Sequence, residues 1–142
     1  MQLKTPDSAI RDWLYATLHE NLSVEEKVVA TFDGVDDLET SEELVFGQSV
    51  VTPNGRTKDQ IVYDCEIQLV LRSKEPGTYV LDLITKQIFS VLQTAAPDFR
   101  IDLGEEWSGC ALAFETYITL PAQHGNTGHV TERIIELRFT CQ

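Results

Sequence analysis

The clearest hydrophobic pattern in the chain lies in residues 59–72, which read DQIVYDCEIQLVLR. From Ile61 to Leu71 every odd position carries an apolar side chain, whereas the even positions are mixed and include Asp64 and Glu66. Because successive side chains of a strand point to opposite faces, this alternation predicts a long strand with one face in a core. The other face must meet water, a neighbouring subunit or a partner.

A second extended run, ELVFGQSVVT at residues 43–52, precedes this strand. Asn54-Gly55 lies between the two runs and is a strong hairpin signal, because both residue types accept the backbone angles of a tight turn. We therefore predict one long antiparallel hairpin from residues 43–52 and 60–72, with a turn at 53–59.

Two other stretches repeat apolar residues at helical spacing. The first spans residues 8–22, and Asp7 or Ser8 is the expected N-cap. The second spans residues 78–95 and is ended by Pro97. The expected apolar faces consist of Ile10, Trp13, Leu14, Thr17, Leu18 and Leu22 in the first helix, and of Val80, Leu83, Ile84, Gln87, Ile88, Val91, Leu92 and Ala95 in the second.

Four further stretches, 27–32, 98–104, 110–120 and 130–141, have the pattern of strands. Residues 121–129, PAQHGNTGH, contain two glycines and a proline and are predicted to form a flexible loop. The resulting order is α-β-β-β-α-β-β-β within a single domain of 142 residues. Each helix has one apolar stripe and most strands alternate, so we expect an α+β fold: a mixed, mainly antiparallel sheet with two helices packed on one face.

The charge balance changes the range of plausible partners. The chain has 23 acidic and 11 basic residues and a net charge of -12. Contact with a phosphate backbone needs clustered Lys and Arg, so direct nucleic-acid binding is disfavoured. The N-terminal sequence lacks the apolar stretch of a signal peptide, and no apolar run approaches the roughly 20 residues of a membrane span. We expect a soluble protein of the cytoplasm with no membrane partner.

The three cysteines, Cys65, Cys110 and Cys141, lie in predicted strands on the same phase as apolar residues. Their number is odd and none belongs to a C-x-x-C pair. A catalytic cysteine would need a nearby base and an electropositive setting, for which the sequence gives no indication. The expectation is three reduced thiols in the core.

The chain contains no recognisable catalytic or metal-binding motif: no G-x-S-x-G, no glycine-rich phosphate loop and no H-E-x-x-H. His124 and His129 flank the predicted loop, but no cysteine or carboxylate accompanies them at zinc-ligand spacing. The acidic cluster beside Trp107 fits a turn at the end of a strand better than a glycosidase pair. We therefore expect no enzyme activity, no metal and no cofactor.

The order of elements, together with three stretches of sequence, resembles the phage tail terminator (tail-completion) proteins of lambda-type long-tailed phages. The stretches are SAIRDWLYATL near the start, the strand-turn-helix around residues 65–92, and the final strand ERIIELRFTC with its LRF. The resemblance covers nearly the whole chain. It implies a mixed sheet flanked by helices and a non-enzymatic virion protein, assembled in the host cytoplasm and located at the tail–neck junction.

The same resemblance implies a hexameric ring that caps the tail tube, ends its polymerisation and forms the surface for head–tail joining. The implied partners are further copies of the chain, the tail tube protein and a head-completion or connector protein. DNA would pass through the ring without sequence-specific binding.

Several polar residues are candidates for contacts with a neighbouring subunit or a partner. They come from the mixed face of the long strand, from the basic hairpin turn and from the predicted loop: Asp64, Glu66, Gln68, Arg56, Lys58, His124 and His129. Asp64 and Glu66 are expected to face solvent, a lumen or the next subunit. In the acidic stretch 33–43, which is expected to be a solvated loop, Asp36, Asp37 and Glu39 are candidates to line a lumen and repel DNA.

Two other functions remain open from the sequence alone. One is another phage neck protein, such as a head–tail connector, which shares partners with a terminator. The other is a non-enzymatic cytoplasmic binding module, which predicts a monomer or dimer with one apolar pocket.

Overall fold

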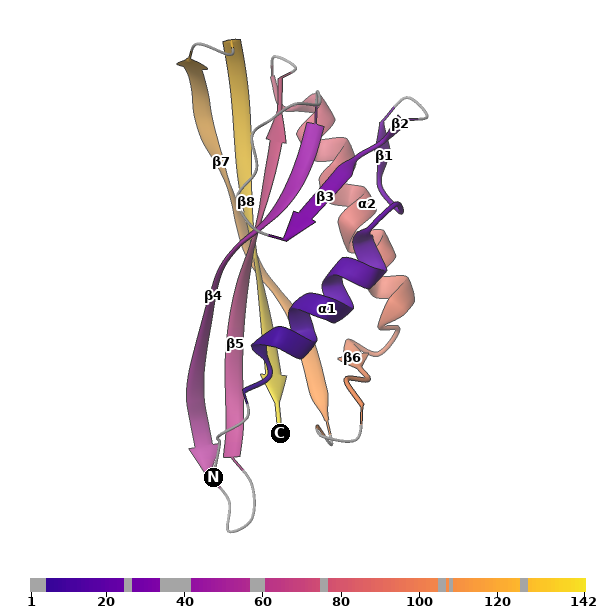
Figure 1. Ribbon diagram of the computed structural model, residues 1–142, viewed down its shortest axis with the longest axis vertical. Helices are drawn as coiled ribbons and strands as arrows, with labels where there is room; N and C mark the ends of the chain where they lie inside the picture. Colours follow the sequence, from indigo (N-terminus) through magenta and orange to yellow (C-terminus); the bar gives the residue numbers. More distant parts are fainter. Residues whose placement is uncertain are drawn as a thin grey trace.

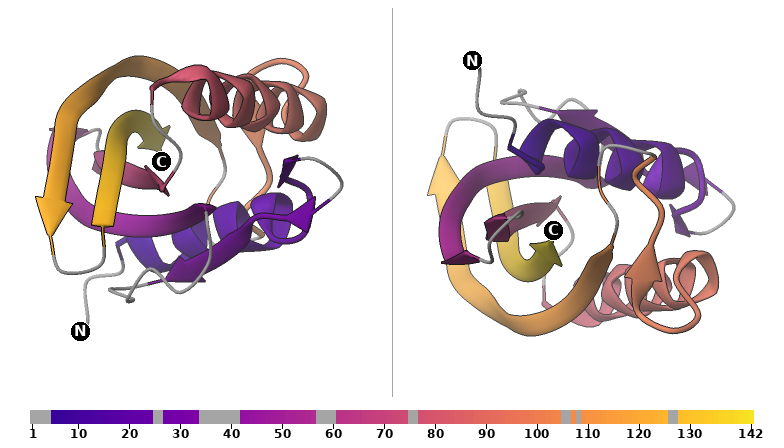
Figure 2. Two further views of the ribbon diagram at one scale, coloured as in Figure 1. Left: turned by 90° about the horizontal axis from the view of Figure 1, so that it is seen from above. Right: turned by 90° about the horizontal axis from the view of Figure 1, so that it is seen from below.

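The computed structural model describes residues 5–24, 27–33, 42–56, 61–74, 77–104, 107, 109–125 and 128–142. Two helices lie on one face of a long, twisted sheet, as predicted (Figure 1). Seen from above and below, the sheet curls and both helices remain on the same side of it (Figure 2). The strand order across the six-stranded sheet is β3-β4-β5-β8-β7-β6. The α+β fold class and the predicted order of elements are confirmed.

The helices agree with their predicted positions apart from their ends. Helix α1 spans Asp7–Leu18 and α2 spans Tyr79–Ala95. Helix α1 ends before residue 22 because the chain leaves helical geometry at His19, and Glu20 takes a positive φ of 65°. The predicted N-caps are wrong: the cap position of α1 is Pro6, which makes no side-chain cap hydrogen bond.

A small hairpin and six sheet strands complete the fold. Their bounds are β1 (Ser23–Val24), β2 (Lys27–Val28), β3 (Ala30–Asp33), β4 (Glu42–Arg56), β5 (Ile61–Ser73), β6 (Arg100–Ile101), β7 (Cys110–Gly125) and β8 (Gly128–Cys141). Strand β3 pairs with β4 in parallel, and all other neighbours in the large sheet are antiparallel. The sheet is therefore mixed and mainly antiparallel, as expected.

Parts of two predicted turns are instead strand, and the rest of each lies outside the described residues. Strand β4 continues through Asn54-Gly55 to Arg56, with an irregular register between Pro53 and Gly55. Strands β7 and β8 pair as far as Gly125 and Gly128, so the loop predicted at 121–129 is wrong for residues 121–125 and 128–129. Strands tolerate proline and glycine where the ladder is irregular, and these register shifts provide such places. By contrast, β6 is much shorter than the predicted strand 98–104.

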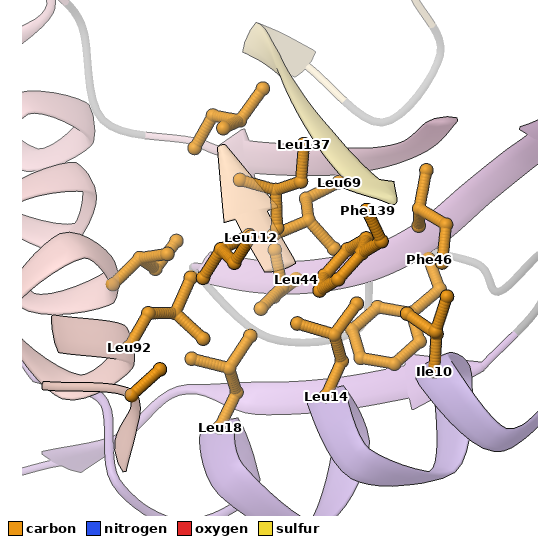
Figure 3. Close-up of a cluster of buried hydrophobic side chains, with 14 of the residues drawn as sticks. Ile10, Leu14, Leu18, Leu44, Phe46, Leu69, Leu92, Leu112, Leu137 and Phe139 are labelled. Carbon is orange, nitrogen blue, oxygen red and sulfur yellow. The ribbon is translucent and has the colours of Figure 1, made fainter. Parts of the chain in front are cut away.

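The core forms between the helices and the apolar face of the sheet. Ile10, Leu14 and Leu18 of α1 point toward the sheet and are fully buried (Figure 3). The odd-numbered face of β5 enters the same core, as the alternation predicted. Fully burying one such side chain stabilises a fold by about 1.5–3 kcal/mol, so this layer holds the helices against the sheet. The side chains of the sheet that Figure 3 labels in this core are Leu44, Phe46, Leu69, Leu112, Leu137 and Phe139.

Helix α2 is turned slightly from its predicted orientation. Leu81 and Thr85 are buried although neither belonged to the predicted apolar face, whereas Ala95 of that face is exposed. Thr85 can enter the core because its hydroxyl donates a hydrogen bond to the carbonyl oxygen of Leu81 at 2.6 Å. A buried hydroxyl with a partner costs little, which a hydrophobic pattern does not reveal.

One buried arginine joins α2 to the sheet. Arg133 of β8 is only 4% exposed, and its guanidinium lies 2.8 Å from the carboxylate of Asp82 in α2. It also donates to the hydroxyls of Thr85 and Thr119, both at 3.0 Å, and stacks over the ring of Tyr117. These contacts satisfy a charge that the core would otherwise exclude.

The expectation of three reduced cysteines is wrong for two of them. Cys110 and Cys141 lie directly opposite each other in β7 and β8, with their Cα atoms 4.2 Å apart, and they form a disulfide. Cys65 is a free, fully buried thiol, and burial raises its pKa to about 11. Alternation placed all three cysteines toward the core, but only the β7–β8 register determines which two meet.

Candidate assembly surface

The sheet face turned away from the helices carries three of the predicted contact residues, Asp64, Glu66 and Gln68. We call it the outer face; it is formed by β4, β5, β8 and β7. Glu66 is exposed on this face and Gln68 is half-buried. Directly opposite Glu66 in β8 lies Arg138, and opposite Gln68 lies Glu136. The sequence therefore placed the mixed face of β5 correctly, but it could not show which charges it meets.

Asp64 belongs to an ion-pair cluster rather than to an open surface. Arg138 donates to one oxygen of its carboxylate at 2.8 Å, and the Thr140 hydroxyl donates to the other at 2.9 Å. Arg138 also reaches Glu115 of β7 at 3.3 Å. The hydrogen bond from Arg138, aided by that from Thr140, lowers the pKa of Asp64 below its ordinary value of 3.8, although burial acts in the opposite direction.

This cluster corrects the prediction for Asp64. Asp64 is only 8% exposed, because neighbouring side chains on β8 cover it. A buried carboxylate whose oxygens are already bound is poorly suited to contact a neighbouring subunit.

A second ion-pair cluster crosses the outer face nearer the other end of the sheet. Arg72 of β5 lies 3.3 Å from Glu43 of β4 and 3.8 Å from Glu132 of β8. Glu43 is fully buried. In both clusters one arginine lies between two acids on the neighbouring strands, so part of the negative charge of the chain is neutralised within the sheet.

An apolar row runs between charged rows on the outer face. It consists of four direct cross-strand neighbours: Val45 of β4, Val70 of β5, Ile134 of β8 and Ile118 of β7. Exposure increases along this row, from the buried Val45 to Ile118, which is 53% exposed. The row therefore ends in an exposed isoleucine on β7.

The other described contact candidates lie at the ends of the two long hairpins, away from the centre of this face. Arg56 pairs with Ile61 at one end of the β4–β5 hairpin, and His124 pairs with His129 near the end of the β7–β8 hairpin. These hairpins extend toward opposite ends of the molecule (Figure 1). Lys58 and the proposed lumen acids Asp36, Asp37 and Glu39 lie outside the described residues.

Over the described residues, the sheet also has two open edges, on β4 and on β7. Strand β3 pairs only with residues 43–46 of β4, and β6 pairs only with residues 110–111 of β7. Within the described part of the chain, no strand pairs with the far side of β4 at 50–56 or of β7 at 113–125. Nearer the core these edges are covered: Arg11 donates to the carbonyl oxygen of Gly47, and Phe99 accepts from the backbone N–H of Leu112.

The sequence signal for these edges is a local absence of charge. Residues 47–55 and 116–125 contain no Asp, Glu, Lys or Arg, although the chain as a whole is highly charged. Edge strands of monomeric proteins are commonly protected by charged side chains. Val50, Tyr117 and Ile118 are instead large apolar residues on these edges, 44%, 49% and 53% exposed.

A shallow apolar pocket of about 340 Å³ lies beside the open edge of β7. It is lined by Phe89 of α2, by Phe114, Glu115, Thr116 and Tyr117 of β7, and by Ile135 and Glu136 of β8. The rings of Phe89 and Phe114 are 4.7 Å apart. The bulge between Phe114 and Thr116 opens the strand at this position.

Two structural features bear on other kinds of site. Among the residues that the structure describes, no three His, Cys, Asp or Glu side chains gather as metal ligands. Neither helix is long and apolar enough, over the residues described, to cross a membrane.

Comparison with known proteins gives no relative from which to transfer a function. The chain matches no protein-family model, and no curated protein sequence matches it.

Proposed function

We propose that the chain is a structural assembly protein of a long-tailed phage, which caps the tail tube as a ring of identical subunits. The observation that carries the proposal is the pair of open edges on opposite sides of one sheet. Two different edges associate head to tail, and head-to-tail contacts close into a ring when the rotation between neighbours permits.

Two further observations support this assignment. The fold has the element order on which the resemblance to tail terminator proteins rests, with two helices on one face of a mixed sheet. The long hairpins extend along the molecule and bring β-sheet backbone to both ends (Figure 1). In the proposed role these surfaces bind neighbouring subunits, the last ring of the tail tube and a connector protein, and no catalytic step is needed.

The proposal is tested by measuring mass and by adding the tail tube protein. Light scattering over a wide concentration range should show a concentration-dependent increase toward a ring, which we expect to be a hexamer visible by negative-stain microscopy. Added to polymerising tube protein, the chain should shorten the tubes and bind at their ends.

Two outcomes would contradict the proposal. A chain that stays monomeric at every concentration and leaves tube length unchanged cannot be a capping ring. A stable monomer or dimer that binds a small apolar ligand beside Phe89 and Phe114 would instead favour the binding-module alternative.

A further inference from the structure

We infer that the subunits join by pairing the open edge of β4 in one copy with the open edge of β7 in the next, forming a β-sheet that continues from subunit to subunit. This inference rests on the self-association proposed above and names its interface. The occupant of each edge is therefore a second copy of the same chain.

The strand directions favour this pairing. Strands β4 and β5, β5 and β8, and β8 and β7 are all antiparallel, so β4 and β7 run in opposite directions (Figure 1). When a second copy is placed beside the first in the same orientation, its β4 therefore runs antiparallel to β7. Over the described residues, no strand pairs with the backbone donors and acceptors of these two edges, and pairing between subunits would satisfy them.

The side chains favour one register, in which Val50 lies opposite Ile118. Both residues are exposed on the outer face. The same register places Val51 opposite Tyr117 on the core-facing side and Thr52 opposite Thr116 on the outer face. Pairs of β-branched and aromatic residues are favourable across strands, and a shift by one residue would place outer-face side chains opposite core-facing ones.

The irregular positions of the two strands also coincide in this register. Pro53 has no N–H to donate, and it lies opposite Glu115 at the bulge of β7, where the ladder is already interrupted. Charge does not oppose the contact, because residues 50–55 are uncharged and Glu115 is already paired with Arg138. A surface of this kind suits association between acidic copies that otherwise repel each other.

The register also defines how neighbouring subunits are offset. Val50 lies on the cross-strand row of Glu66 and Arg138, whereas Ile118 lies on the row of Val70 and Ile134. Pairing Val50 of one subunit with Ile118 of the next therefore shifts the second subunit along the strand direction relative to the first. A closed ring built this way requires strands inclined to the ring axis, as in closed β-barrels.

Cysteine cross-linking between two different variants tests the inference. Val50→Cys and Ile118→Cys are purified separately, mixed at a concentration at which the wild type associates, and oxidised mildly. Directly opposite residues in an antiparallel pair lie within disulfide range, so we expect a covalent dimer in the mixture and little in either variant alone. The native thiol does not interfere, because Cys65 is fully buried.

Val28→Cys provides the matched control, because Val28 is an exposed aliphatic residue of the small β1–β2 hairpin, outside the six-stranded sheet (Figure 1). Mixed with Ile118→Cys, it should give no covalent dimer above background. A second pair of variants, Val50→Lys and Ile118→Lys, should abolish association while circular dichroism shows retained structure, whereas Val28→Lys should associate as the wild type does.

Each other outcome has a distinct meaning. The wild type could associate while the mixed variants form no cross-link, or while each variant alone forms the same covalent dimer. Either result overturns the edge pairing and leaves the proposed function standing. A wild type that remains monomeric throughout the concentration range overturns the edge pairing. If it also leaves the length of the tail tubes unchanged, the proposed function is overturned as well.

Discussion

At the scale of single residues, the main finding is that polar side chains on the sheet mostly bind one another. Asp64 was predicted to face outward from β5, and it does lie on the outer face, but Arg138 and Thr140 occupy its oxygens. Glu66, two residues further along the strand, is exposed. The two acids are alike in the sequence. Only the β5–β8 register shows that Asp64 is bound within the sheet whereas Glu66 remains exposed.

Asp64→Asn should lower stability near neutral pH and remove part of the acid sensitivity of the fold. The pKa of Asp64 is lower in the folded chain than in the unfolded chain, so its carboxylate stabilises the fold above its ordinary pKa of 3.8. This contribution is lost as the pH falls through the lowered pKa. We expect a loss of about 1 kcal/mol at pH 7, from urea titration, that disappears in strongly acidic solution.

Glu66→Gln is the control for this prediction, because Glu66 is exposed on the same strand face. It should change the free energy of unfolding by less than about 0.5 kcal/mol. Equal effects of the two substitutions at all pH values would mean that the bonds to Asp64 contribute nothing specific.

The cysteines provide a second prediction at this scale. In the native protein without reductant, a thiol reagent should react very slowly, because Cys65 is fully buried and its pKa is raised to about 11. After unfolding in urea, one thiol per chain should react, since Cys110 and Cys141 are bonded. Three reactive thiols in the unfolded, unreduced chain would contradict the disulfide.

At the scale of elements, α2 is held to the sheet by apolar packing and by one charged contact. Arg133 is buried, whereas its partner Asp82 is 54% exposed at the start of the helix. Removing the acid leaves a buried positive charge with only neutral partners, whereas replacing the arginine by an apolar residue leaves an acid that water can solvate. Removing the Asp82 carboxylate and replacing Arg133 by an apolar residue should therefore lower the free energy of unfolding by different amounts.

Asp82→Asn should destabilise the fold by about 1–2 kcal/mol, a value reduced from that of a fully buried pair because Asp82 is half in water. Arg133→Met keeps much of the side-chain volume and should cost less than Arg133→Ala, which also leaves a cavity. Urea unfolding of the three variants measures these differences. If Arg133→Met were the most destabilising of the three, the hydrogen bonds and ion pair of Arg133 would stabilise the fold more than expected for a partner, Asp82, that is 54% exposed.

At the scale of the whole molecule, the distribution of charge matters more than its total. The chain has a net charge of -12, yet residues 47–55 and 116–125 of the open edges carry no charge and the outer face pairs its arginines with acids. In the proposed assembly, copies of such a molecule repel each other at long range and attract each other on close contact of the edges. This arrangement favours association that depends strongly on concentration and on salt.

Added salt should therefore strengthen self-association. Raising the salt concentration from about 0.05 M to 0.5 M shortens the screening length severalfold and reduces repulsion between acidic copies. Light scattering at constant protein concentration and pH 7 should show a larger mean mass at high salt. A smaller mass at high salt would indicate an interface held by ion pairs and would argue against pairing of the uncharged edges.

The elements were predictable because their signals are local. Period-two alternation identified β5, and period-3.6 stripes identified α1 and most of the buried face of α2. The extra strand length of β4 and β7 was missed because glycine and proline indicate turns locally, whereas the pairing of neighbouring strands satisfies their backbone. The same limit applies to Thr85, whose burial depends on a hydrogen bond to Leu81.

The sequence by itself determined the fold class, the order of the elements and which strand faces enter the core, because side-chain periodicity follows directly from helix and strand geometry. Tertiary structure alone decided that Cys110 meets Cys141, that Asp64 is bound by Arg138, and where the sheet edges remain open. These features depend on the register between strands distant in sequence, since one step in register changes every cross-strand partner. The candidate surface therefore emerges only when the strands are assembled.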